Sequence, residues 1–278
     1  MHILVTGATG FIGRHLVPLL LARGCQVTAT ALERDPAPFP WLAGAAYRPL
    51  DLSAAPVDDL HAYFGRPDIL VHLAWEGLPR YRERFHFEEN LPRHYSFLKN
   101  LLTHGLADLT VAGTCFEYGL REGCLGEDLT ACPDNAYALA KDTLRRFLLE
   151  LRRDVPFHFK WARLFYLHGP GQNPRSLLAQ LDRALEAGDT VFPMSPGDQE
   201  RDYLPVAEAA DRLARIACQR RVEGIVNCCS GRPVRIRDLV LQHLARRNRT
   251  IQLDLGRYPY PDTEPMRFWG STAKFDTI

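Results

Sequence analysis

The sequence predicts an α/β protein with a doubly wound parallel sheet and a small C-terminal lobe. Short runs rich in β-branched and apolar residues alternate with segments of helical periodicity, as expected when a helix follows each strand. Several runs, such as ILVT and ILVHLA, are apolar on both faces, which is typical of strands covered by helices on both sides. Together these patterns indicate a Rossmann-type fold.

The expected elements follow one another without a long linker or an internal repeat. The expected strands are Ile3–Thr6, Gln26–Ala31, Tyr47–Leu52, Ile69–Ala74, Leu109–Thr114, His158–Phe165 and Ile225–Ser230. Helices are expected near residues 11–23, 56–64, 84–104, 135–153, 174–187, 206–219 and 235–247.

A glycine-rich loop lies between the first strand and the first helix, with the spacing G-x-x-G-x-x-G. In such a loop Gly7 permits a tight turn, Gly10 lets backbone N–H groups approach a pyrophosphate, and Gly13 allows close contact between helix and strand. The positive end of the following helix then faces the phosphates. The predicted dinucleotide site therefore comprises Gly7, Thr9, Gly10, Phe11, Ile12 and Gly13.

The end of the second strand should bind the adenosine ribose, where NAD-selective proteins place an acidic residue. Ala31 occupies this position, and Arg34 nearby is suited to a 2′-phosphate, so the sequence favours NADP. Glu33 keeps NAD open as the alternative. Asp51 and Leu52 follow the third strand and are expected to contact the adenine, although a turn-capping role for Asp51 is equally compatible.

A tyrosine and a lysine four residues apart lie on a predicted helix that begins after Asp134 or Asn135. This spacing places Tyr137 and Lys141 on one helix face. A nearby cation stabilises a phenolate, so Tyr137 is suited to exchange a proton with a substrate oxygen. Thr114 ends the fifth strand, at the sheet edge where ligands bind in this fold class, and its hydroxyl is suited to orient a carbonyl.

Glycine loop, strand-end hydroxyl and Tyr–Lys pair occur in an order that resembles the extended short-chain dehydrogenase/reductase family, the nucleotide-sugar epimerases, dehydratases and reductases. The resemblance covers residues 1 to about 245. It implies a cofactor channel that includes Leu73, Ala74, Asn90, Lys141 and Tyr166. It also implies that Arg201, in the segment RDYLPV, meets the diphosphate of a sugar nucleotide.

Some positions depart from that family's usual pattern. Thr114 replaces the common Ser and keeps the hydroxyl, whereas Tyr166 stands where Asn is frequent. Glu117 is close enough to Thr114 to bond sugar hydroxyls, with pairing to a nearby Arg as the alternative. Trp75, in a loop expected at the mouth of the site, is a further candidate for substrate binding.

The pattern divides the chain into two parts. We expect residues 1–165 to form a dinucleotide-binding domain to which 206–245 returns, and residues 166–205 and 246–278 to form the small substrate-binding lobe. Leu98, Leu101, Leu102, Leu144, Phe147 and Leu148 fit either a helix-bundle homodimer or ordinary core packing.

Composition excludes several other classes. The chain has 278 residues and a formal charge of 34 − 33 = +1, which does not favour nucleic-acid binding. No apolar run approaches the roughly 20 residues of a membrane span. Seven cysteines without a C-x-x-C pair indicate free thiols and a cytoplasmic protein, and the histidines have no metal-ligand spacing, so no metal site is expected.

These observations predict an NAD(P)-dependent oxidoreductase acting on a nucleotide-linked sugar, with reduction of a 4-keto-6-deoxyhexose as the leading hypothesis. An NAD-dependent nucleotide-sugar 4-epimerase uses the same residues and is the first alternative. A regulator that senses NADP without chemistry is an alternative from another class. The Tyr–Lys–Thr set argues against the regulator, since a sensor needs no proton donor.

Overall fold

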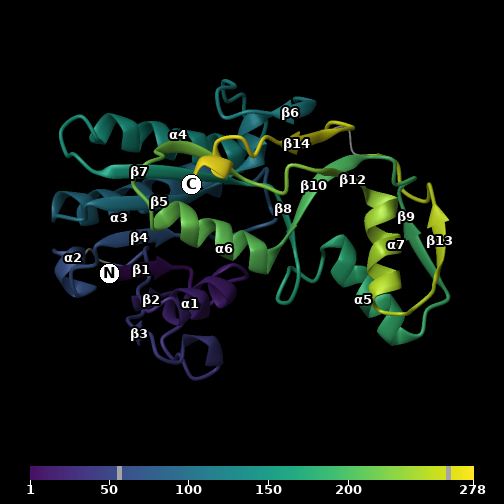
Figure 1. Ribbon diagram of the computed structural model, residues 1–278, viewed down its shortest axis with the longest axis horizontal. Coiled ribbons are helices and arrows are strands. Elements are labelled where there is room, and N and C mark those ends of the chain that lie inside the picture. The colour runs from purple at the N-terminus through teal and green to yellow at the C-terminus, as the bar shows by residue number, and fades with distance from the viewer. Residues whose placement is uncertain (55–57, 261–263) are drawn as a thin grey trace.

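A computed structural model describes residues 1–54, 58–260 and 264–278. Its centre is a seven-stranded sheet whose described pairs are all parallel, in the order β11-β7-β5-β4-β1-β2-β3 (Figure 1). The strands are β1 (His2–Thr6), β2 (Gln26–Thr30), β3 (Ala46–Tyr47), β4 (Ile69–His72), β5 (Asp108–Thr114), β7 (His158–Leu164) and β11 (Gly224–Cys228). The predicted fold class is confirmed, and six of the seven predicted strands agree closely, while β3 overlaps its predicted range only at Tyr47.

Helices cover both faces of the sheet, as strands apolar on both faces require. On one face α1 (Gly13–Ala22) and α6 (Val206–Ala217) pack over β1, β2, β4 and β11. On the other, α2 (Leu60–Tyr63), α3 (Leu91–Thr103) and α4 (Ala136–Leu151) pack over β1, β4, β5 and β7. We call the sheet and these helices the large unit; the helices lie on both sides of the sheet (Figure 1), and an apolar cluster fills each interface.

The strand order reverses beside β1, because β2 and β3 follow on one side and β4 lies on the other. Such a switch point leaves a crevice at the carboxyl ends of the strands, where this fold class binds ligands. The glycine loop follows β1 and residues 73–75 follow β4, so both border this crevice.

Two predicted elements differ in extent. Regular pairing in β3 ends at Tyr47, earlier than the predicted strand end at Leu52. The Arg48 and Leu50 amides still donate to the Ala29 and Ala31 carbonyls, so the segment stays beside β2. The helix predicted near 56–64 is the short α2, and its expected start lies outside the described residues.

The predicted helix near 84–104 has two parts, a π-helical segment η2 (His86–Asn90) followed by α3. Pro92 lies at the junction, where its missing N–H interrupts regular helical hydrogen bonding. The π turn brings His86 and Asn90 to buried positions close to the crevice, and turns of this type often occur at functional sites.

The small lobe combines β8 (Tyr166–His168), α5 (Leu177–Ala187), β9 (Val191–Met194), β10 (Glu200–Pro205), β12 (Pro233–Arg235), α7 (Ile236–Arg246) and β13 (Gln252–Leu255). Figure 1 shows α5 and α7 side by side, with β9 and β13 along them, away from the large sheet. Leu181, Leu185, Phe192, Val240 and Leu244 belong to the apolar core of this lobe. The expected return of 206–245 to the large unit is therefore wrong for α7, whose apolar face packs on α5 instead.

The C-terminal residues also differ from the expected division, because they pack on the large unit although the sequence placed them in the lobe. β14 (Phe268–Gly270) pairs with β6 (Gly123–Leu125), and η4 (Phe275–Thr277) places Phe275 in the core beside α6. Residues 268–278 therefore lie against the large unit and not in the lobe, where the sequence placed them, whereas Glu264 and Met266 bond Arg201 of β10. An apolar Phe near the end of the chain completes the α1–α6 core.

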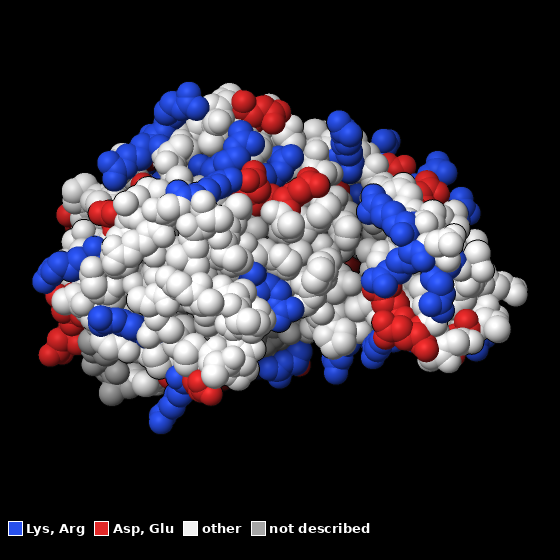
Figure 2. Space-filling view, turned by 60° about the horizontal axis from the view of Figure 1, so that its bottom comes forward, with Lys and Arg blue, Asp and Glu red and all other residues white. Residues whose placement is uncertain are grey.

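The surface agrees with the balanced charge. On the face drawn in Figure 2, Lys and Arg alternate with Asp and Glu, and a wide uncharged area covers the large unit. Among the residues that the structure describes, no helix is long and apolar enough to cross a bilayer. Leu98, Leu101, Leu102, Leu144 and Leu148 are buried within the chain, so only Phe147 of the candidate dimer residues is exposed.

Candidate active site

The glycine loop has the close contacts that its spacing predicts. Gly7 has a φ of +65°, and a Cβ on it would lie 2.9 Å from the Ala74 nitrogen. A Cβ on Gly13 would lie 2.4 Å from the Gly7 oxygen, so α1 begins directly against the loop. Gly10 is exposed, and a Cβ there would meet only the Gly7 oxygen within 4 Å. The loop thus presents uncovered backbone at the positive end of α1, which fits a pyrophosphate.

Two residues that the sequence reasoning missed lie beside this loop. The Trp41 Nε1–H donates to the Ala8 carbonyl, and the Arg14 guanidinium lies 4.4 Å from the Trp41 ring centre. The buried Arg14 Nε has no hydrogen-bond partner among the described residues. A basic residue directly after the third glycine was the available signal. The unsatisfied nitrogen beside the exposed loop adds to its fit for an anionic cofactor.

The adenosine end of the site contains both charges noted in the sequence. The Thr9 hydroxyl donates to the Glu33 carboxylate at 2.9 Å, which holds Glu33 against the glycine loop. Arg34 is exposed. Asp51 accepts bonds from the Ser53 amide and hydroxyl, which lower the pKa of its carboxyl. Asp51 and Leu52 also line a cavity of about 430 Å³ between this turn and α3, where an adenine contact stays a prediction.

The residues after β4 also border the expected cofactor channel. The Leu73 and Ala74 amides donate to the Thr6 hydroxyl, which fixes this turn against β1. Asn90 is buried and donates to the Glu76 carbonyl. Phe11 is half-buried and lines the large cavity described below, while Ile12 packs on the α1–α6 core.

Thr114, Tyr137 and Lys141 come together from two elements. Thr114 ends β5 and N-caps the turn η3 (Cys115–Tyr118), while Tyr137 and Lys141 lie on the first turns of α4, which Asn135 caps. The Thr114 and Tyr137 side chains line the same cavity, and Thr114 is near enough to act on the pKa of the Tyr137 phenol. The Lys141 ammonium is buried and donates to the Ala112 carbonyl at 2.8 Å. The structure therefore places a phenol, a hydroxyl and an ammonium at the carboxyl ends of the strands.

Burial dominates the electrostatics of these groups. Burial raises the pKa of Tyr137, and the Thr114 side chain opposes that rise. Burial lowers the pKa of Lys141 to about 7, and the negative charge of Glu117 acts in the opposite direction. Burial thus favours the neutral form of both side chains, so the structure does not show the stabilised Tyr137 phenolate that the sequence predicted.

Glu117 does not have the role that the sequence suggested. Its side chain is fully buried and accepts hydrogen bonds from the Thr114 amide, the Trp161 indole and the Arg163 guanidinium. The expected bond to sugar hydroxyls is therefore wrong, since both carboxylate oxygens are already used and closed off from the cavity. The alternative, pairing with an Arg, describes the observed arrangement. Glu117 supports the turn that carries Thr114.

Arg201 is also largely withdrawn from the cavity. Its guanidinium is buried over the Phe268 ring and bonds the Glu264 carboxylate and the carbonyls of Glu200 and Met266. A contact with the substrate diphosphate would have to compete with the Glu264 ion pair. The family resemblance could not reveal this, because Glu264 lies more than 60 residues away in sequence.

Trp75 lies within the site but is enclosed on both faces. One face stacks on His94, with 4.5 Å between ring centres, and the Lys141 nitrogen lies 4.2 Å from the ring centre. The expected substrate contact does not fit this packing, because both ring faces are occupied by the protein.

A cavity of about 760 Å³ joins the catalytic groups to the lobe. Thr114 and Tyr137 line one end, and Gln172, Arg175 and Ser176 line the lobe side. Tyr166 lines the middle, where its buried hydroxyl has no hydrogen-bond partner among the described residues. This volume accommodates a ligand larger than a simple sugar.

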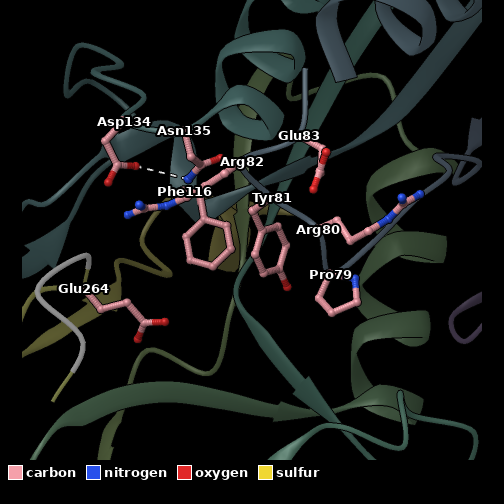
Figure 3. Close-up of a pocket in the computed structure, with 9 residues that line it drawn as sticks. All are labelled: Pro79, Arg80, Tyr81, Arg82, Glu83, Phe116, Asp134, Asn135 and Glu264. Carbon is pink, nitrogen blue, oxygen red and sulfur yellow. Dashed lines mark hydrogen bonds between the residues drawn. The ribbon is translucent and has the colours of Figure 1, made fainter. Parts of the chain in front are cut away.

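A second cavity of about 310 Å³ adjoins the first and shares Pro79, Tyr81, Phe116 and Glu264 with it. Figure 3 shows the Tyr81 and Phe116 rings side by side, with Glu264 on the other side of Phe116. The two ring centres lie 5.1 Å apart. The wall beside Tyr137 is thus aromatic, and Glu264 is the carboxylate that both cavities share.

Residues 3–229 match the sequence model of the NAD dependent epimerase/dehydratase family. The chain belongs to this family. Within the described residues, no group of three His, Cys, Asp or Glu side chains is placed to hold a metal ion. That the glycine loop, the residues after β4 and the Tyr–Lys–Thr set form the NAD(P) site stays a prediction.

Curated relatives include dehydrogenases and reductases of nucleotide sugars. The chain is 28% identical to a dTDP-6-deoxy-L-talose 4-dehydrogenase (NAD(+)) of Aggregatibacter actinomycetemcomitans, over 98% of this chain and 100% of that protein. It is 26% identical to a GDP-6-deoxy-D-mannose reductase of Pseudomonas aeruginosa, over 86% and 78% of the two chains. Members named as epimerases also match, at 22–24% identity.

Solved structures share the fold over nearly the whole chain. MoeE5, in complex with UDP-glucuronic acid and NAD, has a TM-score of 0.82 and 24% identity, covering 100% of this chain and 92% of its own. A UDP-N-acetylglucosamine 4-epimerase from Methanobrevibacter ruminantium M1 has a TM-score of 0.84 and 19% identity, covering 99% and 90%.

Proposed function

We propose that this protein is a nucleotide-sugar 4-dehydrogenase or reductase that interconverts a 4-keto-6-deoxyhexose and its 4-hydroxy form. The observation that carries the proposal is the meeting of Thr114, Tyr137 and Lys141 at the strand ends, beside an uncovered glycine loop and at one end of a large cavity. Relatives named as a dTDP-6-deoxy-L-talose 4-dehydrogenase and a dTDP-4-dehydro-6-deoxyglucose reductase support the choice of sugar position.

The nicotinamide supplies or accepts the hydride at the sugar C4 when it is bound. Tyr137 donates its phenolic proton to the C4 oxygen as the ketone becomes an alcohol, and takes the proton back in the oxidation. Thr114 accepts the Phe116 amide through its oxygen, which leaves its O–H to hold the substrate oxygen. Lys141 stabilises negative charge on Tyr137 and has N–H groups beyond the Ala112 bond for the cofactor ribose.

In the lobe, Arg175 and Ser176 are better placed than Arg201 to bind the substrate diphosphate. Arg175 is exposed and lines the large cavity just before α5. The Ser176 hydroxyl, at the N-cap position of α5, is buried without a hydrogen-bond partner in the described structure. A helix N-terminus, a cation and an unused hydroxyl together attract phosphate oxygens. We therefore place the diphosphate beside Arg175 and Ser176.

Glu33 supports NAD, in contrast to the NADP that the sequence favoured. Its carboxylate is fixed on Thr9 beside the glycine loop and would repel a 2′-phosphate at that position. Arg34 is the neighbouring residue that would favour NADP. The ratio of NADH to NADPH use in the Glu33→Gln variant tests this assignment, since removal of the negative charge should improve NADPH use relative to NADH.

The deciding experiment incubates the purified protein with dTDP-, GDP- and UDP-linked 4-keto-6-deoxyhexoses and either reduced cofactor. Stoichiometric consumption of the cofactor, lost in Tyr137→Phe, is the expected result. Conversion to a 4-epimer without added cofactor, with NAD released on denaturation, would instead establish an epimerase. Cofactor binding without turnover of any sugar nucleotide, unchanged in Tyr137→Phe, would establish the regulator.

A further inference from the structure

The Lys141 ammonium is buried without an ion-pair partner within 4 Å among the described residues. Its contacts are the Ala112 carbonyl at 2.8 Å and the Trp75 ring, whose centre lies 4.2 Å away. An indole face attracts a cation, and more strongly where water is excluded. Trp75 therefore replaces part of the hydration that Lys141 loses on folding.

Trp75 is itself fixed on its edge and on its other face. Its Nε1–H donates to the His86 Nδ1 at 3.1 Å, and the His86 Nε2–H donates to the Arg80 carbonyl. His94 stacks on the opposite face, with an angle of 15° between the ring planes. The indole is thus sandwiched between His94 and the Lys141 ammonium, and its rotation is blocked by His86.

A hydrogen-bonded chain fixes the proton positions behind this stack. The Thr6 hydroxyl accepts the Leu73 and Ala74 amides, so its own hydrogen must go to the His72 Nδ1, 2.9 Å away. The His72 Nε2–H then donates to the His94 Nδ1 at 2.8 Å. Both imidazoles are therefore neutral, and His94 adds no positive charge behind the indole.

The charged and titratable groups that face Lys141 come from every element packed around it. Glu117 of η3 lies near enough for its negative charge to act on Lys141. Burial lowers the pKa values of His72 on β4, His86 in η2 and His94 on α3, and the positive charge of Lys141 adds to that lowering, so none of these rings readily becomes a second cation. Among these groups, Tyr137 is the one on α4, the helix that also carries Lys141.

We propose that Trp75 is a positioning residue for the reaction: its indole, clamped by His86 and His94, holds the Lys141 ammonium beside the Tyr137 phenol. The proposal rests on the proposed function for the part that Lys141 plays in hydride transfer. Trp75 touches neither reacting atom. Trp75 affects the reaction indirectly, because it fixes the position of the Lys141 ammonium and stabilises its positive charge.

The test is a double-mutant cycle with Trp75→Leu, Lys141→Met and the pair, each measured by urea unfolding at pH 6 and pH 9. Because burial lowers the pKa of Lys141 to about 7, the ammonium is charged at pH 6 and neutral at pH 9. We expect a coupling of roughly 2- to 30-fold in the unfolding constant at pH 6, lost at pH 9. No coupling at pH 6, or equal coupling at both values, overturns the proposal.

This readout needs no turnover, so it separates the two hypotheses. A wild-type protein that reduces no sugar nucleotide refutes the proposed function, while the cycle still decides the role of Trp75. With an active enzyme, the falling limb of kcat/KM against pH should move down by roughly one pH unit in Trp75→Leu. If Trp75→Leu lowers kcat/KM equally at every pH and the falling limb of the profile stays at the same pH, the positioning role is contradicted.

Fluorinated tryptophan at position 75 covers the case in which Trp75→Leu does not fold. Fluorination weakens the attraction of the ring face for a cation and leaves its shape nearly unchanged. We expect the falling limb of kcat/KM to move to lower pH with each added fluorine atom. A falling limb that stays at the same pH counts against the proposal. The matched control is the same substitution at Trp269, which carries the Arg267 guanidinium 4.9 Å from its ring centre, away from Lys141.

Discussion

The large unit and the small lobe differ in how the chain assembles them. In the large unit neighbouring strands are joined through covering helices, and each motif, such as the glycine loop, is contiguous. The lobe brings distant segments together, as in the pairing of β9 with β13, residues 191–194 with 252–255. The contrast suggests a division of labour, in which local motifs supply the chemistry and long-range assembly supplies recognition of the substrate.

The sharpest test of this division compares one substitution in the large unit with one in the lobe. Tyr137→Phe removes the proton donor and should lower kcat by about 10²- to 10⁴-fold with cofactor affinity retained. Arg175→Gln removes a charged contact with the diphosphate and should raise KM about tenfold or more with kcat unchanged. Steady-state kinetics with one sugar nucleotide checks both.

Tyr81→Phe is the control for the tyrosine, because its ring lies 5.6 Å from that of Tyr137 and the substitution keeps the aromatic wall. A large fall of kcat in Arg175→Gln would show that the lobe takes part in the chemical step, and the division would fail.

Truncation of the two cores asks whether the parts unfold together. Leu16→Ala in the large unit and Leu181→Ala in the lobe each remove a fully buried side chain and should cost about 2–5 kcal/mol. We expect each to shift one common unfolding transition in calorimetry, because the paired strands β8 and β10 are continuous with β7 and α6 of the large unit. Two separated transitions, each sensitive to one substitution, would mean that the lobe folds by itself.

Low pH should destabilise the large unit, because its buried histidines bind protons less readily in the folded chain than in the unfolded chain. Burial lowers the pKa of His72 to about 3, so below its ordinary value of 6.5 the unfolded chain binds a proton that the folded chain does not. Stability is therefore full above pH 6.5 and declines as the pH falls toward 3. For His72 alone the loss between pH 7 and pH 5 is about 2 kcal/mol.

Urea unfolding at pH 7, 6 and 5 measures this loss, and the lowered pKa of His94 adds to it. A His72→Gln variant that still folds should show a shallower pH dependence over the same range. An equal slope in both proteins would place the acid sensitivity elsewhere.

The smallest expected effect compares two turn glycines. Gly24 and Gly188 follow helices with φ of +76° and +79°, and a Cβ on either would meet nothing within 4 Å. Alanine at either position should therefore cost about 1 kcal/mol, from backbone strain alone. Thermal melts of Gly24→Ala and Gly188→Ala should agree closely, and a larger loss at one of them would show that its surroundings are tighter there.

The fold of the large unit was predictable because its signals are local. Segments such as Ile3–Thr6 and Ile69–His72 are apolar on both faces and carry their own evidence of burial. The lobe gave no such signal. Its strands have three to six residues and pair with partners far away in sequence, so α7 and residues 268–278 were each assigned to the wrong part.

The site divides in the same way. Thr114, Tyr137 and Lys141 were predicted from spacing and meet as expected. Glu117 was misread because nothing local shows that Trp161 and Arg163, on the next strand of the sheet, point at its carboxylate.

The residues that the sequence reasoning missed act through the fold. His86 and His94 reach Trp75 only because a π turn and α3 bring them there. Helical periodicity assigns both histidines to the interior without naming a partner for either.

The three-stranded sheet at the junction restricts how the cavity can admit a ligand. β10, which leads back to α6, lies between β8 and β12, and Tyr203 is in register with Tyr166 of β8. Because β8 follows β7 and β10 runs into α6, two hydrogen-bonded strands connect the lobe to the large unit, and a wide swing about a single hinge would have to distort both. Entry of a bulky ligand therefore calls for a shallow rocking of two connected bodies, with the strands bending together and their ladder intact.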